Sequence, residues 1–150
     1  MLVEMSSGKR AQLLGSIEIE VRKLIAGAIL FNEKVAASVG LNSTDLQFIN
    51  LLQLEVARTP GDLARWSGLT TGGVTVALDR LEKAGCITRQ PNPDDRRSVI
   101  IRPVEAKLRQ FQSMYQARGD SLRKAVEAFN DRDLALILDF LRRVLSGGRE

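Results

Sequence analysis

The sequence predicts a mainly α-helical chain with one small β-hairpin, and three observations lead to this fold class. Apolar residues recur at helical spacing without proline from Lys9 to Val39, residues 58–85 divide into two short helices around a glycine turn, and residues 86–102 form two short apolar runs around a polar turn. A helical stripe then continues to about residue 147. Two helices and a hairpin in this order predict a winged helix-turn-helix between long terminal helices.

Composition excludes several classes of function. The 150 residues are 44% hydrophobic and 27% charged, as in a folded globular protein. Histidine is absent and Cys86 is the single cysteine, which disfavours zinc sites, histidine catalysis and a disulfide within the chain. No glycine-rich phosphate loop, nucleophile elbow or metal cluster occurs. We therefore expect no enzymatic activity, no cofactor and no metal, and the lack of a membrane span or secretory pattern predicts a cytoplasmic protein without a membrane partner.

Positive charge gathers in the middle of the sequence. Residues 58–102 have eight basic and five acidic side chains, whereas residues 1–57 have five basic and six acidic ones. A basic segment of this kind is compatible with a polyanionic partner.

The first predicted helix spans 9–39 and is long for a small domain. Its apolar series alternates steps of three and four, the a/d spacing of a helix that packs along another helix: Leu14, Ile17, Val21, Leu24, Ala28, Phe31 and Val35. Because a small domain cannot bury a helix of this length, we expect it to meet a second subunit. The alternative is that it packs within its own chain.

A second helix follows the stop signal at Gly40. Asn42 or Ser43 is its predicted N-cap, and Asp45 lies in its first turn, where a negative charge favours the helix dipole. This helix is expected to run to about Val56.

The next two helices are short and well delimited. Thr59 caps the first, Pro60 suits its first position, and Gly68 ends it. Thr70 caps the second, and Gly85 closes it. The expected inner face of this second helix consists of Val74, Leu78 and Leu81.

The hairpin, or wing, follows directly. Its predicted strands are Cys86–Arg89 and Ser98–Arg102, and the proline-, asparagine- and aspartate-rich segment Gln90–Asp95 is predicted as a turn. Arg96 and Arg97 are placed near its tip.

The remaining sequence predicts two helices. Pro103 can open the first of them, Gly119 is a candidate interruption, and Asn130-Asp131 can end it and cap the next. The last helix carries a leucine-rich stripe, which we expect to pack with the first helix of the chain: Leu134, Ile137, Leu138, Leu141 and Leu145.

These elements and the stretch TPGDLARWSGLTTGGVTVALDRLEKAGCITRQPNPDDRRSVIIR (59–102) resemble the multiple-antibiotic-resistance regulator (MarR) family. The motifs DRLEKAG and DDRR stand close to the family form. The resemblance implies a single protomer over 1–150, with a DNA-binding region at 42–102 and dimerisation helices at 9–39 and 103–147. It also implies a homodimer that binds a pseudo-palindromic duplex-DNA operator, usually represses transcription, and is released by a small aromatic or amphipathic effector.

The sequence departs from the family pattern at three places. Thr70-Thr71-Gly72-Gly73 stands where a capping serine or threonine followed by proline is common, and Val76 replaces a frequent arginine. After the wing, Pro103, Val104 and Lys107 replace a leucine-threonine pair and a glycine. The operator sequence therefore cannot be taken from a relative.

Ten residues are candidates for contact with DNA: Thr70, Thr71, Gly72, Gly73, Thr75, Val76, Arg80, Asp95, Arg96 and Arg97. In the major groove, a threonine can hydrogen-bond a base or touch a thymine methyl, and the glycines allow the backbone to approach. Arginine at the wing suits a narrow minor groove, and the resemblance suggests that one arginine reaches the groove while Asp95 braces the other. Because this helix has few base-reading side chains, phosphate contacts and DNA shape should supply much of the affinity.

Several of these residues have a structural alternative. Thr70 can be a cap and no more, the glycines can simply begin the helix, Arg96 and Arg97 can belong to a solvated turn, and Arg80 can form an internal salt bridge in place of a phosphate contact. For an effector pocket, the candidates by position are Phe31, Phe48, Trp66 and Phe111, each of which can equally be core. Cys86 is expected to be a buried small hydrophobe.

A rival function remains open at this point. A winged helix can also serve protein or RNA interaction without binding an operator.

Overall fold

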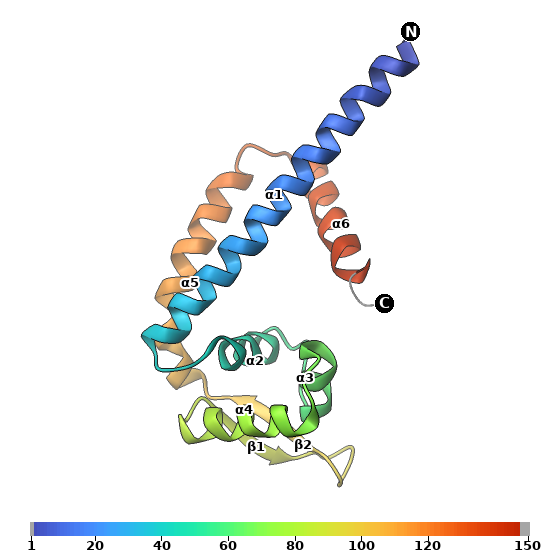
Figure 1. Ribbon diagram of the computed structural model, residues 1–150. Helices are drawn as coiled ribbons and strands as arrows, with labels where there is room; N and C mark the ends of the chain where they lie inside the picture. Colours follow the sequence, from blue (N-terminus) through green and yellow to red (C-terminus); the bar gives the residue numbers. More distant parts are fainter. Residues whose placement is uncertain (1, 148–150) are drawn as a thin grey trace. The chain divides into compact units, whose positions relative to one another are not determined.

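The computed structural model describes residues 2–147 and has the predicted order of helices and hairpin (Figure 1). The helices are α1 (Leu2–Ser38), α2 (Ser43–Gln53), α3 (Pro60–Ser67), α4 (Thr71–Lys83), α5 (Glu105–Val126) and α6 (Asp131–Gly147), and the strands are β1 (Ile87–Pro91) and β2 (Val99–Pro103). The chain divides into two compact units, Met1–Leu108 and Arg109–Glu150. The predicted fold class, mostly helical with a two-stranded wing and long terminal helices, is confirmed.

The helix α1 begins earlier than predicted: it starts at Leu2 and continues through Gly8, a stretch that contains no proline. Within the first unit it packs against α2, and Val35 and Ala36 are buried at its C-terminal end. Most of its remaining length exposes leucine and isoleucine side chains.

The helix α2 is capped by Asn42, which resolves the choice between Asn42 and Ser43. Asn42 Oδ1 accepts a hydrogen bond from the Asp45 backbone N–H at 2.9 Å, and Asp45 Oδ2 accepts one from Asn42 N–H at 3.5 Å. The helix ends at Gln53 and not at the predicted Val56. It stops because Glu55 adopts the left-handed region at φ 56°, which turns the chain toward α3.

The helix α3 has the predicted Thr59 cap, with Pro60 at its first position. Asp62 completes the capping box by accepting from the Thr59 N–H at 2.9 Å. Burial alone would raise the pKa of Asp62, but hydrogen bonds from Arg58 and Thr59 and the charge of Arg65 lower it. Gly68 ends the helix at φ 68°, a conformation that favours glycine and makes the tight turn into α4.

The core of the first unit lies between α2, α3, α4 and the hairpin. Helix α4 packs against α2, α3 and β1, while β2 packs against α2 and α3. The predicted inner face of α4 is confirmed, because Val74, Leu78 and Leu81 are all buried. The backbone N–H of Ile101 also donates to the carbonyl of Arg58 at 2.9 Å, which joins the segment before α3 to the hairpin.

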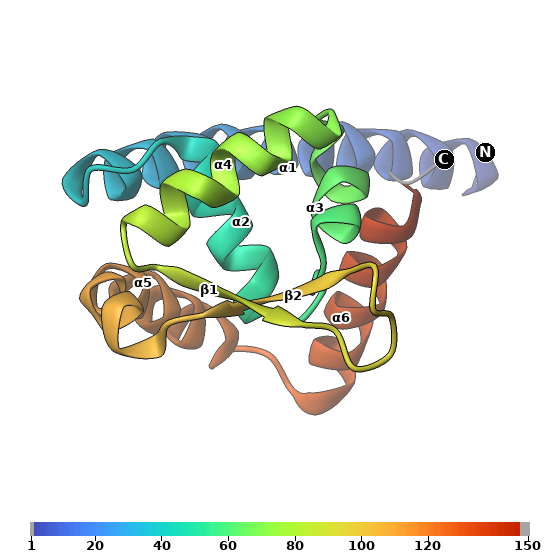
Figure 2. The ribbon, with the colours of Figure 1, turned by 90° about the horizontal axis from the view of Figure 1, so that it is seen from below.

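The strands β1 and β2 are antiparallel, with Ile87 opposite Pro103 and Pro91 opposite Val99. The first strand therefore continues through Gln90 and Pro91, which were predicted to lie in the turn. Proline is tolerated there because it lies at the end of the strand. Figure 2 shows the turn of the hairpin projecting beyond α3 and α4.

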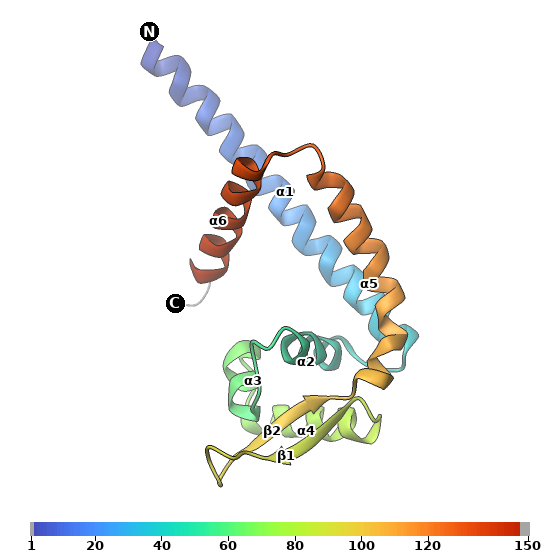
Figure 3. The same cartoon turned by 180° about the vertical axis from the view of Figure 1, so that it is seen from behind.

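Pro103 does not open α5, contrary to the prediction, because it pairs with Ile87 as the last residue of β2. The carbonyl of Val104 instead accepts the first helical bonds, from Lys107 and Leu108. Helix α5 passes through Gly119 without interruption (Figure 3). The predicted cap of α6 is confirmed, since Asn130 Oδ1 accepts from the Asp133 N–H at 3.0 Å.

We find no single helix among the described residues that is long and apolar enough to cross a membrane. The segment Gly8–Ser38 of α1 meets the criteria of length and composition only together with α2, from which it is bent by 101°.

Candidate nucleic-acid interface

The start of α4 presents the predicted recognition residues on one exposed surface. Thr71, Gly72, Thr75 and Val76 are exposed, and Gly73 is half-buried. Thr70 serves as the N-cap, because its Oγ1 accepts a hydrogen bond from the Gly73 N–H at 3.2 Å. Without DNA, Thr70 therefore acts as a helix cap, which was the structural alternative to a DNA contact.

Gly72 has free space around it. A Cβ atom placed there would meet nothing within 4 Å, whereas one at Gly73 would lie 3.5 Å from Thr70 Oγ1. Packing within the chain thus does not require glycine at position 72, although glycine costs a helix about 0.5–1 kcal/mol relative to alanine.

Arg80 forms an internal salt bridge, one of its two predicted roles, but its partner is distant in sequence. Its Nη2 and Nε donate to the two carboxylate oxygens of Asp45 at 2.7 and 3.1 Å. Among the described residues, Asp45 is the charged side chain that is buried, at 1% exposure. This hydrogen bond raises the pKa of Arg80. The pair joins the first turn of α2 to the second half of α4.

A second ion-pair cluster joins α4 to the wing, and sequence reasoning did not find it. Arg89 on β1 donates to Asp79 Oδ1 at 2.6 Å and also binds Glu82. The two acidic residues are three apart and therefore lie on one face of α4, and this spacing, followed by an arginine on the next element, was the signal that could have revealed the cluster. The neighbour of Arg80 in sequence, Asp79, therefore binds Arg89.

The wing tip is organised by backbone hydrogen bonds. Asp95 Oδ1 accepts from the Arg97 N–H at 2.9 Å, and the Asp95 carbonyl accepts from the Ser98 N–H at 3.0 Å. Asp95 therefore braces the backbone of Arg97, whereas the resemblance suggested only that it braces one of the two arginines. In the described part of the chain, the exposed guanidinium groups of Arg96 and Arg97 have no ion-pair partner.

Two of the four candidate pocket residues line the same cavity. Phe48 on α2 and Trp66 on α3 border a space of about 430 Å³, and Trp66 Nε1 donates to the Val56 carbonyl at 3.0 Å. The other lining residues are Thr44, Gln47, Leu51, Ser67 and Leu69. Phe31 and Phe111 do not line this cavity, and Phe111 is buried on α5.

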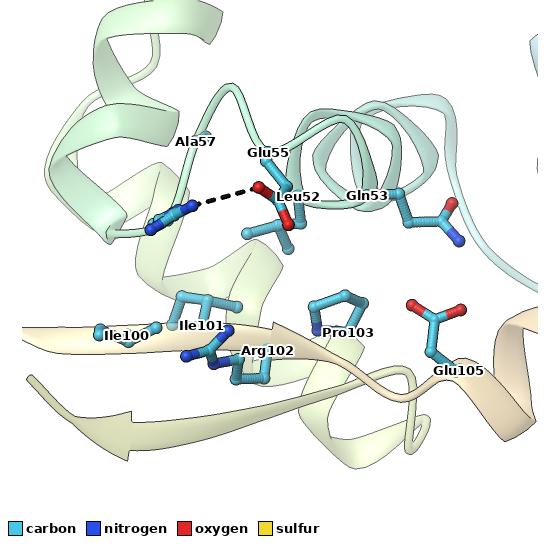
Figure 4. A pocket seen from close by; sticks show the side chains of 10 residues that line it. Leu52, Gln53, Glu55, Ala57, Ile100, Ile101, Arg102, Pro103 and Glu105 are labelled. Carbon is cyan, nitrogen blue, oxygen red and sulfur yellow. Dashed lines mark hydrogen bonds and ion pairs between the residues drawn. The ribbon is translucent and has the colours of Figure 1, made fainter.

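A second, more polar cavity of about 250 Å³ lies between the end of α2 and β2 (Figure 4). Glu55 lies on one side of it and pairs with Arg58 at 3.2 Å, while Arg102 and Glu105 lie on the other side. None of the aromatic candidates borders this cavity.

Cys86 is buried between α4 and β1, as predicted. Burial raises the pKa of its thiol, which disfavours the reactive thiolate. The described residues contain no group of three histidine, cysteine or acidic side chains that could hold a metal.

Comparison with known proteins gives a consistent result. A family model described as "MarR family" matches residues 39–98. The HTH-type transcriptional regulator YcgE of Bacillus subtilis is 35% identical over 120 residues, which cover 80% of this chain and 78% of YcgE. The multiple antibiotic resistance protein MarR of Escherichia coli is 28% identical over 103 residues, or 67% of this chain and 72% of that protein.

Solved structures show the same fold. A MarR family protein from Bacillus stearothermophilus superposes with a TM-score of 0.67 at 19% identity, covering 93% of this chain and 97% of the other. Wild-type apo MarR from E. coli gives a TM-score of 0.59 at 19% identity, covering 85% and 95%.

We expect Asp45→Asn to lower the free energy of unfolding by about 2 kcal/mol, because the ion pair with Arg80 is lost and the amide has one acceptor oxygen in place of two. The loss stays below that of a fully buried pair because the Arg80 side chain is 45% exposed and can be hydrated. Urea denaturation measures this change. The matched control is Asp139→Asn, which breaks an exposed pair with Arg143 and should cost about 0.5 kcal/mol or less. Equal losses for both variants would contradict the bracing role of Asp45.

Proposed function

The chain belongs to the MarR family of winged helix-turn-helix transcriptional regulators, and we propose that it represses transcription as a homodimer on a pseudo-palindromic duplex-DNA operator. The observation that carries this proposal is the pairing of an exposed, small-residue start of α4 with an arginine wing tip. An α-helix can enter the major groove, where base edges differ. The wing can follow the adjacent backbone or minor groove.

The division of positive charge supports this mode of binding. Arg80 and Arg89 are engaged with acidic residues of their own chain, whereas Arg96 and Arg97 remain exposed at the tip of the hairpin. Free arginines attract phosphates and a narrow minor groove. We therefore assign the main electrostatic contacts with DNA to the wing, and the contacts with base edges to α4.

The operator is found by selecting bound sequences from a random duplex library, with RNA as competitor. Enrichment of a palindromic duplex that RNA does not displace supports the proposal, and reduced transcription from a promoter that overlaps this duplex supports repression. Preferential binding to RNA, or no enriched duplex, would favour a winged-helix module for RNA or protein interaction.

Arg97→Ala should weaken operator binding by about tenfold. It should also reduce the slope of log K against the logarithm of the salt concentration by about two, because each of the two wings of the dimer loses one phosphate contact. The fold should be unaffected, because the structure uses the Arg97 backbone and not its guanidinium group. Gel-shift titration at several salt concentrations measures both changes. Arg132→Ala removes the same charge at the exposed start of α6 and serves as control. Unchanged binding by Arg97→Ala would remove the wing from the interface.

Dimerisation through the terminal helices rests on their exposed apolar surfaces. One face of α1 forms an apolar depression of about 310 Å³, lined by Leu13, Ser16, Ile17, Glu20, Val21 and Leu24. On α6, Leu138, Leu141 and Leu145 are exposed and recur at helical spacing, and no residue of this helix is buried. Helical surfaces of this composition normally pack against another helix, and we assign that role to a second copy of the chain.

Leu141→Glu should convert the protein to a monomer at micromolar concentration, since it places a charge in the proposed apolar interface. Leu136→Glu is the matched control, because Leu136 is 69% exposed and lies on the opposite side of α6 from Leu141. Sedimentation velocity gives the oligomeric state of both variants. A monomeric wild-type protein would contradict the proposal directly.

We propose that the effector that releases the protein from DNA binds in the cavity lined by Phe48 and Trp66. A small aromatic or amphipathic compound there would contact both α2 and α3, the helices that support α4. If such a compound binds one arrangement of these helices more tightly than another, it shifts the population that can bind DNA.

Trp66 is the single tryptophan of the chain, so its fluorescence should report on this cavity. A compound that fits should change Trp66 emission and lower operator affinity over the same concentration range. A panel of aromatic acids, phenols and amphipathic amines is the probe. Compounds that release the operator but leave the emission unchanged would place the effector site elsewhere.

A further inference from the structure

The exposed face of α4 has few polar groups left for reading bases. The exposed residues of this helix are Thr71, Gly72, Thr75, Val76, Asp79, Arg80, Glu82 and Lys83. Asp79 and Glu82 bind Arg89, and Arg80 binds Asp45. These three charged side chains therefore hold α4 in place within the chain.

The hydroxyl of Thr75 is also engaged. Its Oγ1 donates to the Thr71 carbonyl one turn earlier, at 2.9 Å. A serine or threonine that bonds in this way directs its hydroxyl back to the helix. What remains for contact from Thr75 is its methyl group. In the described part of the chain, the hydroxyl of Thr71 and the ammonium group of Lys83 have no such partner, and they lie at opposite ends of the helix.

Val76 is 56% exposed. A helical side chain leans over the turn that precedes it, and for Val76 this turn contains Gly72 and Gly73. Neither glycine has a side chain to cover the two valine methyl groups. The central part of the exposed face is thus a small apolar surface made by Val76 and the Thr75 methyl group.

We propose that this surface reads the 5-methyl group of thymine in the major groove, and that Val76 is the residue that determines this specificity. The inference rests on the proposed binding to duplex DNA. Thymine is distinguished in the major groove by its O4 acceptor and its C5-methyl group. An apolar surface without a free donor recognises the methyl group, and the bare backbone at Gly72 allows the valine to approach it. The ligand class is a duplex with a 5-methylpyrimidine at the contacted position.

The test uses the operator selected from the random library and replaces each thymine singly by deoxyuridine. This change removes one methyl group and leaves base pairing and all hydrogen-bonding groups intact. The wild-type protein should lose about fourfold in affinity at one position of each half-site, the value expected for one buried methyl group. At that position, a cytosine–guanine pair should bind weakly, and 5-methylcytosine should recover part of the loss.

Two variants assign the effect to Val76. Val76→Ala should bind the thymine and deoxyuridine duplexes equally at the sensitive position, and its fold should be intact because the side chain is exposed. Val76→Thr keeps one of the two methyl groups and should retain part of the discrimination. Circular dichroism and thermal unfolding confirm that both variants are folded.

The possible failures are distinct. If the wild-type protein binds every deoxyuridine duplex as tightly as the parent operator, or if Val76→Ala keeps the full preference, methyl reading by Val76 is wrong while duplex binding stands. If the library yields no enriched duplex, the proposed function fails and this inference fails with it.

Discussion

The carboxylate of Asp45 is the constraint on which the position of α4 depends. It is buried, completes the capping box of α2 through Asn42, and binds Arg80 through two hydrogen bonds. A buried charge is tolerated only when its oxygens are satisfied. The Asp45 carboxylate therefore caps α2 and also fixes the position of α4. If either helix moved independently of the other, a buried charge would be left unpaired.

The ion pairs around α4 explain why this helix has so few unpaired polar side chains on its exposed face. Arg80 holds it to α2, and Arg89 holds it to the wing through Asp79 and Glu82. Charged side chains that would otherwise face outward are used to orient the helix. In the proposed complex with DNA, Arg96 and Arg97 therefore supply the electrostatic attraction, and the first half of α4 supplies shape and methyl contacts.

The sequence predicted the local features well because neighbouring residues determine them. The Thr59 and Thr70 caps, the glycine ends at Gly68 and Gly85, and the buried stripe of α4 all depend on spacing within a few residues. The fold class followed from the order of these elements, and the family resemblance over 59–102 agreed with it.

The features that sequence reasoning missed depend on contacts across the fold. The partner of Arg80 lies 35 residues away, and nothing in the spacing of Asp45 indicates it. Pro103 has the properties of a helix start, but strand pairing with Ile87 holds it in β2. Of the aromatic candidates, Phe48 and Trp66 meet at one cavity because α2 and α3 bring them together, whereas helical periodicity alone could not separate them from Phe31 and Phe111.

The free space at Gly72 also bears on how such a regulator can change its target. Apart from its chain neighbours and the backbone of its own helix, a Cβ at this position would meet nothing within 4 Å, so a larger residue could be introduced without repacking the core. Most positions that alter recognition also alter stability, and this coupling limits which mutations survive. Under the proposed mode of DNA binding, Gly72 is free of that coupling, so gene duplication followed by a single substitution here could give a paralogue with a new operator preference and an undamaged fold.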